Sequence, residues 1–334
     1  MILIVLGHVL RYGAIRNIVY SFHVPYFFFL SGITEKDDLS LKRLSLEVQR
    51  LLIPYYSFGL VSIAIYGVLG SVAGSNLDVA VSESFWRNVA ILLYGSSWLP
   101  FNAPLWFLPC LFATKLWYQL LFKYLNENIV LLIPVVAFGV IAAFIYTDLG
   151  LPDLPFSFIL MLKLFPFFFL GRLIAKWLIA KWLTAYGDVE KQSIIVLVAG
   201  LILLTLTAVL GTIAPPVNYT SHSFPNPFVF YSVALIGGGG MYLVSIILHN
   251  IRWLAYLGRK TMMVLTMHKF PVVFFQIVGP FEKLLQKPDS LKAFAFGGIP
   301  VTVITVVMCL AVGCIIERYL PVLLGKKRGN TLGT

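Results

Sequence analysis

Two histidines near the start of the chain, His8 and His23, have the clearest capacity for chemistry in this sequence. An imidazole has a pKa close to neutrality, so it takes up a proton and returns it under ordinary conditions. The turn RYGAIRN lies between the two apolar runs that carry them, with its tip near Ala14. At about 1.5 Å per helical residue, His8 would lie about 9 Å from the tip and His23 about 13 Å. We therefore expect both imidazoles at a similar depth on adjacent antiparallel helices.

Two imidazoles placed in this way can activate a hydroxyl group and protonate a leaving thiolate. Pro25 follows His23 by two residues, and a proline kinks a helix because it lacks an N–H and clashes with the preceding turn. Such a kink leaves room for a ligand. The alternative is that both histidines are hydrogen-bonded residues of a helix interface. The sequence offers no third ligand nearby, so a zinc site is disfavoured and we predict no metal.

The elements that must position these residues are membrane helices. Hydrophobic residues make up 59% of the 334 residues and charged residues 12%, and the mean hydropathy is +0.90. A soluble domain carries about 25% charged residues, whereas a bilayer-crossing helix needs about 20 mostly apolar residues. No stretch is long and polar enough to form a separate soluble domain. We predict an all-α, polytopic transmembrane helix bundle that forms one membrane-embedded domain over residues 1–334.

About ten spans follow from the apolar runs. The first run is too short to cross a bilayer, so we expect the first helix to be truncated at its N-terminus. The connection after the seventh run contains four prolines and no charged residue, which is typical of a structured loop outside the membrane. The predicted spans are 1–11, 17–34, 51–73, 105–125, 129–146, 156–174, 193–212, 227–248, 261–280 and 293–318.

The net charge of +11 is compatible with nucleic-acid binding, but its distribution favours another interpretation. Lysine and arginine concentrate in the connections after the second, sixth and eighth spans and in the C-terminal tail. Such a bias sets the orientation of a membrane protein, and it also suits contact with anionic lipid or a phosphate-bearing cofactor. We predict a multi-pass protein of the plasma (inner) membrane, with both termini cytoplasmic and no nucleic-acid partner.

Several segments carry a family resemblance. GHVL followed by YSFHVPYFFFLSG resembles the opening of the acyltransferase 3 family of membrane acyltransferases. The segments QRLLIPYYSFG, APLWFLPCLF, FPFFFLGRL and LGRKTMMVLTMHKFPV agree with it in the same order, so the resemblance covers nearly the whole chain. The pattern looks closest to the fucose 4-O-acetylase-like subgroup.

The resemblance implies transfer of an acyl group, usually acetyl from acetyl-CoA, to a hydroxyl of a cell-surface or exported carbohydrate. The acceptor would be an exopolysaccharide, an O-antigen or another envelope glycan. The family's two histidines fall on His8 and His23. We expect His8 to act as general base toward the acceptor hydroxyl, and His23 to orient it or assist the leaving group.

Three further residues are candidates for binding the acyl donor. The family's basic residue before its RLLIPY-like segment falls on Arg50, whose guanidinium could meet the CoA phosphates. Positive-inside anchoring is the other interpretation of Arg50, and Arg43 is a weaker candidate for the same contact. His268 lies in the ninth predicted span, where it could contact the donor or simply be satisfied within the bundle.

Two other classes of function remain open. A transporter or flippase of a glycan or lipid would use a similar bundle without acyl-transfer chemistry. None of the fourteen Asp and Glu residues lies near the middle of a predicted span, which disfavours transport coupled to protons or sodium. A non-catalytic membrane partner is the third class, because the Arg or Lys that family members carry eleven positions before His8 would precede Met1.

Overall fold

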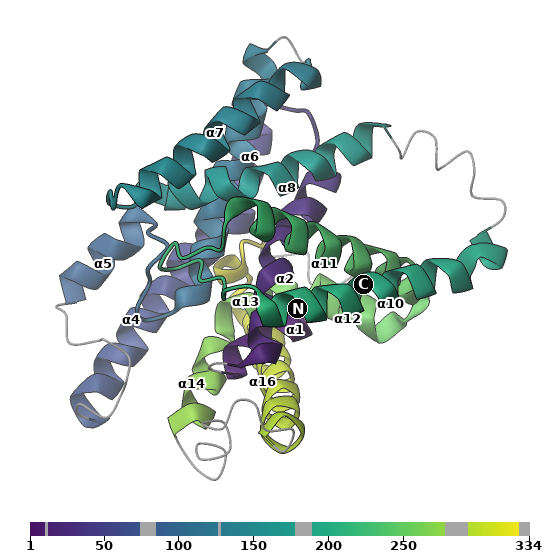
Figure 1. The fold of residues 1–334 in the computed structure, drawn as a ribbon. Coiled ribbons are helices and arrows are strands. Elements are labelled where there is room, and N and C mark those ends of the chain that lie inside the picture. Colours follow the sequence, from purple (N-terminus) through teal and green to yellow (C-terminus); the bar gives the residue numbers. More distant parts are fainter. Residues whose placement is uncertain (11–12, 74–84, 126–127, 178–188, 278–292, 327–334) are drawn as a thin grey trace. The chain divides into compact units, whose positions relative to one another are not determined.

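The computed structural model describes residues 1–10, 13–73, 85–125, 128–177, 189–277 and 293–326 (Figure 1). These residues form helices and connections, and the β-structure among them is limited to one isolated bridge between Asn218 and Ser223. The α-helices are α1 (Ile2–Val9), α2 (Ala14–Ile33), α3 (Leu41–Glu47), α4 (Ile53–Ala73), α5 (Phe85–Tyr94), α6 (Phe107–Tyr124), α7 (Leu132–Asp148), α8 (Phe158–Trp177), α10 (Val189–Ile213), α11 (Pro227–Ile247), α12 (Arg252–Arg259), α13 (Thr261–Met267), α14 (Lys269–Ile277) and α16 (Ile299–Tyr319).

Long apolar helices dominate the described residues, which confirms the predicted all-α transmembrane class. Seven helical stretches among these residues are long and apolar enough to cross a membrane. They are Leu41–Val68, Ala103–Tyr124, Ile129–Asp148, Pro155–Lys176, Ile194–Ile213, Pro227–Asn250 and Phe294–Tyr319. The predicted count of ten was approximate. Two of the predicted spans are not among the seven stretches. The first corresponds to α1, which has only eight residues, and the second to α2, whose twenty residues include polar ones.

Two prolines change helices that the apolar pattern predicts as continuous. Pro271 has no N–H to offer the carbonyl of Met267, and the ninth predicted span is divided at His268 into α13 and α14. Pro54 likewise cannot bond the carbonyl of Arg50, and a π-helical turn, η1 (Val48–Leu52), precedes α4 there. Both interruptions coincide with residues predicted to bind the acyl donor.

The chain folds into two compact units. The first contains the described residues of Met1–Lys36, Leu164–Thr261 and Lys283–Thr302. In this unit α2 packs against α1, α10 and α11, and α10 packs along α11 (Figure 1). The prediction of a single domain over 1–334 stays a prediction.

Within the first unit, α2 and α8 cross at two glycines. A Cβ built on Gly32 would overlap the carbonyl oxygen of Phe168, and one built on Gly171 would overlap the carbonyl oxygen of Phe29. Small residues of this kind let membrane helices approach backbone to backbone. The crossing joins the two aromatic runs PYFFFLSG and PFFFLGR, each through its own glycine, and fixes α2 beside α8.

The second unit contains the described residues of Asp37–Lys163, Met262–Glu282 and Val303–Thr334. A buried amide links its helices, because Nδ2 of Asn102 lies 3.1 Å from Oγ of Ser62 and 3.1 Å from the carbonyl oxygen of Thr266. Tyr66 and Phe270 lie four residues after Ser62 and Thr266, and their rings stack with centroids 5.9 Å apart. The α13–α14 segment therefore runs in the same direction as α4, as the alternation of the predicted spans requires.

Candidate functional site

The helix pair α1 and α2 brings one aromatic side chain, Tyr20, against His8. Gly7 makes this possible, since a Cβ there would lie 2.8 Å from Cε2 of Tyr20 and 3.4 Å from Cγ1 of Val19. The Tyr20 hydroxyl lies 3.1 Å from Nδ1 of His8, and the two ring centroids are 5.7 Å apart. The His8 imidazole is half-buried at this position.

His23 lies against the same phenol ring. The centroids of Tyr20 and His23 are 5.0 Å apart in an edge-on arrangement. His23 is only 5% exposed, and its Nδ1 lies 2.7 Å from the carbonyl oxygen of Val19, one helical turn earlier. The structure therefore brings both predicted histidines into contact with one residue, Tyr20.

Arg16 and Tyr219 complete this cluster. The guanidinium carbon of Arg16 lies 4.1 Å from the centre of the Tyr20 ring, so a cation lies over the face of the phenol. Tyr219, from the connection between α10 and α11, donates its hydroxyl to the backbone oxygen of Tyr20 at 2.8 Å. Burial raises the pKa of the Tyr219 phenol well above its ordinary value, so that hydroxyl keeps its proton for this bond.

The residues that join the histidines were not singled out from the sequence, although a signal for them is present. Arg16, Tyr20 and His23 stand at positions i, i+4 and i+7, which lie on one face of a helix. This spacing places a cation, a phenol and an imidazole together. Tyr219 has no such signal, because it lies almost 200 residues further along the chain.

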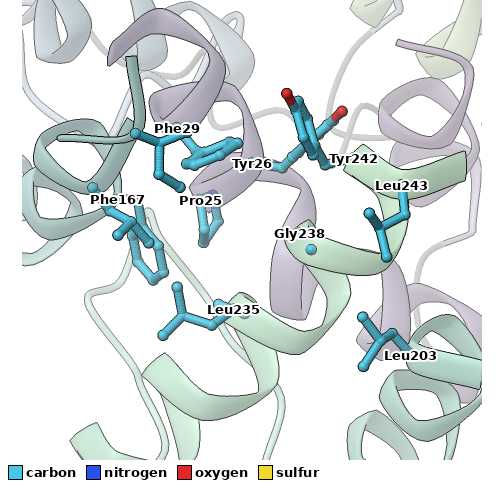
Figure 2. A pocket seen from close by; sticks show the side chains of 13 residues that line it. Pro25, Tyr26, Phe29, Phe167, Leu203, Leu235, Gly238, Tyr242 and Leu243 are labelled. Carbon is cyan, nitrogen blue, oxygen red and sulfur yellow. The ribbon is translucent and has the colours of Figure 1, made fainter. Parts of the chain in front are cut away.

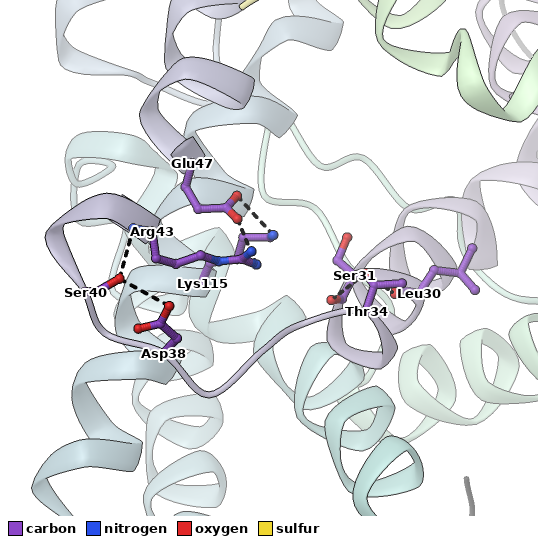
Figure 3. Close-up of polar contacts among 8 residues, drawn as sticks. All are labelled: Leu30, Ser31, Thr34, Asp38, Ser40, Arg43, Glu47 and Lys115. Atoms are coloured by element: carbon purple, nitrogen blue, oxygen red, sulfur yellow. Dashed lines mark hydrogen bonds and ion pairs between the residues drawn. The ribbon is translucent and has the colours of Figure 1, made fainter. Parts of the chain in front are cut away.

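The predicted donor-binding arginines belong to the second unit, where Arg43 is occupied by an internal ion pair. Nη2 of Arg43 lies 3.0 Å from Oε1 of Glu47, and Nζ of Lys115 lies 3.1 Å from Oε2 of the same carboxylate (Figure 3). The side chains of Arg43 and Glu47 are 16% and 8% exposed. Two cations thus share one largely buried carboxylate, an arrangement that suits structural support of α3 and α6.

Arg50 and His268 occupy the two proline-linked interruptions of this unit. Arg50 is exposed on the π-helical turn η1, and such turns frequently occur at functional sites. His268 is fully buried, and its Nδ1 lies 2.7 Å from the carbonyl oxygen of Val264. Of the predicted donor-binding residues, Arg50 is the one whose guanidinium lies open to a ligand.

An apolar pocket of about 270 Å³ lies in the first unit, beside the segment that follows His23 (Figure 2). Its polar side-chain atoms are the hydroxyls of Tyr26 and Tyr242. Such a lining suits a hydrocarbon chain rather than a sugar or a phosphate. The other lining residues are Pro25, Phe29, Phe167, Leu170, Ile174, Leu203, Ala234, Leu235, Gly238, Gly239 and Leu243.

Metal ligation has no candidate in the described part of the chain, where no three His, Cys, Asp or Glu side chains come together. The polar chemistry of the cluster around Tyr20 is instead that of two imidazoles, a phenol and a guanidinium. Such groups can accept, donate and stabilise a proton during transfer of a group between two substrates.

Comparison with known proteins agrees with this chemistry. A search of curated proteins and a search of solved structures each returned no match. The model of the acyltransferase 3 family, described as an acyltransferase domain, matches residues 1–318, which include both histidines and every helix of the described structure up to α16. With its long apolar helices, the protein is an integral membrane protein, and the chain belongs to the acyltransferase 3 family.

Proposed function

We propose that this protein is an O-acetyltransferase that moves an acetyl group from acetyl-CoA to a hydroxyl of a cell-surface or exported carbohydrate. The family indicates a membrane acyltransferase, and its members usually acylate carbohydrates. The observation that carries the proposal is the contact of His8 and His23 with the single phenol of Tyr20. We place the protein in the fucose 4-O-acetylase-like subgroup on the strength of the FHVPYFFFLSG and PLWFLP segments.

The reaction needs one proton acceptor and one proton donor. The acceptor hydroxyl oxygen attacks the thioester carbonyl carbon, a C–O bond forms, and the C–S bond breaks. The hydroxyl proton passes to one imidazole, and the departing CoA thiolate takes a proton from the other. Ser21, the hydroxyl residue that follows Tyr20, donates to the carbonyl oxygen of Ile18 at 2.7 Å, so we propose direct transfer without an acyl-serine.

The donor would be held through its phosphates by Arg50. A guanidinium forms paired, charge-assisted hydrogen bonds with phosphate oxygens, and that of Arg50 is exposed. Arg43 would contribute indirectly, because it shares the carboxylate of Glu47 with Lys115, and that carboxylate links α6 to the helix that leads into η1. By the charge bias of the connections this segment and both termini face the cytoplasm, where acetyl-CoA is available, and the membrane is the inner membrane.

The experiment that tests this function measures free thiol. Vesicles that contain the protein are given acetyl-CoA, with and without an envelope glycan acceptor. We expect thiol release that depends on the acceptor, together with acetyl ester on the glycan. Movement of the glycan across the membrane without thiol release would overturn the proposal and favour a transporter.

A further inference from the structure

We propose that Gly325 is a positioning residue for the acyl donor. It clamps the C-terminal segment onto the π-helical turn η1, and so holds the backbone that presents the guanidinium of Arg50 to the CoA phosphates. This role rests on the proposed contact between Arg50 and the donor. Gly325 and η1 both belong to the second unit.

The π-helical turn deprives the carbonyl of Gln49 of its helical donor. In an α-helix that carbonyl would accept from the N–H of Ile53, but the N–H of Ile53 bonds the carbonyl of Val48 instead. The next residue, Pro54, has no N–H at all. Backbone carbonyls are strong acceptors, so the carbonyl of Gln49 calls for a partner from outside its own helix.

Gly325 lies directly against this carbonyl. A Cβ built on Gly325 would lie only 1.8 Å from the carbonyl oxygen of Gln49 and 3.4 Å from Cα of Arg50. Since a Cα–Cβ bond is about 1.5 Å long, Cα of Gly325 lies within about 3.3 Å of that oxygen. At such a distance a Cα–H forms a weak hydrogen bond with a carbonyl oxygen. The C-terminal segment thus contacts η1 at the residue that precedes Arg50.

The fold of the C-terminal segment holds Gly325 in place. The short 3-10 helix η9 (Pro321–Leu324) packs against α4 and ends at Gly325, whose φ of 67° lies in the left-handed region. The N–H of Lys326 donates to the carbonyl of Pro321 at 3.0 Å, and the ammonium of Lys326 pairs with Glu317 of α16. Two separate requirements therefore select glycine at this position, the left-handed backbone and the close approach to η1.

Arg50 is available to a ligand beside this clamp. Its side chain is exposed, and within the described part of the chain its guanidinium takes part in no ion pair or hydrogen bond. Ordering a long side chain on a ligand costs conformational entropy. A backbone that Gly325 fixes at the preceding residue narrows the positions that the guanidinium can reach, so less ordering remains when the donor binds.

Hydrogen exchange of the full chain in nanodiscs, followed by mass spectrometry with and without CoA, tests the clamp in the wild-type protein. CoA bound at Arg50 should slow exchange in peptides that cover η1 and also in peptides that cover η9 and Gly325, by about tenfold at saturating CoA. Protection of only one of the two segments would overturn the clamp. Protection of neither would overturn the donor role of Arg50, and with it the role of Gly325.

Gly325→Ala and a matched control connect the clamp to donor binding. Gly325→Ala presses a Cβ against the carbonyl of Gln49, so the dissociation constant for CoA, measured without acceptor, should rise by about tenfold. The KM for acetyl-CoA should rise with it while kcat changes little. Gly150 also has a φ of 67°, but nothing lies within 4 Å of its Cβ position, so Gly150→Ala carries the backbone strain alone and should bind CoA as the wild type does. Equal dissociation constants in the two variants would refute the role of Gly325.

A double variant shows whether Gly325 acts through Arg50. Gly325→Ala combined with Arg50→Gln should bind CoA no more weakly than Arg50→Gln alone, because the clamp then has no guanidinium to position. Losses of affinity that multiply would overturn the inference. The predicted pattern of CoA binding in a protein that releases no thiol with any acceptor would instead overturn the proposed acyl transfer and leave the role of Gly325 intact.

Discussion

The hydroxyl of Tyr20 lies 3.1 Å from Nδ1 of His8, on the neighbouring helix. The same phenol ring contacts His23 one turn later along α2, so a single side chain separates two imidazoles that belong to different helices. This relationship joins the two histidines in one polar cluster, and we propose that this cluster carries out the acyl transfer that the family indicates.

Adding a single methyl group at Gly32 or Gly171, where α2 and α8 cross, should destabilise the protein. Gly32→Ala or Gly171→Ala would press a Cβ against a backbone carbonyl oxygen, which no side-chain rotation can relieve. We expect each to lower the free energy of unfolding by about 1 to 3 kcal/mol, measured by thermal or denaturant unfolding in detergent.

Gly239→Ala is the matched control for this prediction. A Cβ on Gly239 would have Leu203 Cδ1 as its nearest neighbour at 3.9 Å, an ordinary van der Waals contact. Its stability should stay close to that of the wild type. Equal stability of Gly32→Ala and Gly239→Ala proteins would show that α2 and α8 do not meet at the glycines.

The carboxylate of Glu47 should be a major contributor to the stability of the second unit. Glu47→Gln would leave the charges of Arg43 and Lys115 facing each other without their shared partner. Removing one partner of a buried ion pair costs about 3 to 5 kcal/mol, and we expect a loss of that order. Lys326→Gln, which breaks the more exposed contact with Glu317, should cost less than about 1 kcal/mol. The reverse order of the two losses would contradict the structural role of Glu47.

Arg50 should affect binding of the acyl donor more than it affects the chemical step. Arg50→Gln removes the exposed guanidinium from η1, so the KM for acetyl-CoA should rise by about tenfold while kcat changes little. Lys42→Gln, an exposed cation on the nearby α3, removes the same charge and should leave KM unchanged. If the two variants raise KM equally, Arg50 acts only through net charge at the membrane surface.

Much of the helical framework could be predicted from the sequence, because some 20 consecutive apolar residues have few alternatives to a membrane helix. The closeness of His8 and His23 also follows from a short turn between two helices. The break at His268 needed the position of Pro271 to be weighed against an otherwise continuous apolar run. Because Pro271 lacks an N–H, the helix breaks there even though the apolar run is long enough to predict one continuous helix.

The polar partners were harder to predict for a different reason. Tyr20 is one of many aromatic residues in this chain, and a tyrosine in a membrane protein ordinarily indicates the membrane–water interface. Its helical spacing to Arg16 and His23 could nevertheless have been recognised in the sequence. Glu47 and Lys115 are 68 residues apart and meet only through the packing of α3 and α6. The contact of Glu47 with Lys115 leaves no local pattern, whereas Arg43 and Glu47 stand at positions i and i+4, a spacing from which their ion pair could have been predicted.

A double-mutant cycle on the two histidines tests the central claim, that they act as one acyl-transfer unit, most directly. The measurement is kcat for acceptor-dependent thiol release from acetyl-CoA by His8→Gln, His23→Gln and the double variant, with folding verified for each. The surface variant His249→Gln, whose imidazole is exposed, serves as control and should retain wild-type kcat. We expect each single variant to lose about 10²- to 10⁴-fold and the double variant to lose no more than the worse single one, since residues of one unit are non-additive. Full activity in either single variant, or losses that multiply in the double variant, would contradict the account.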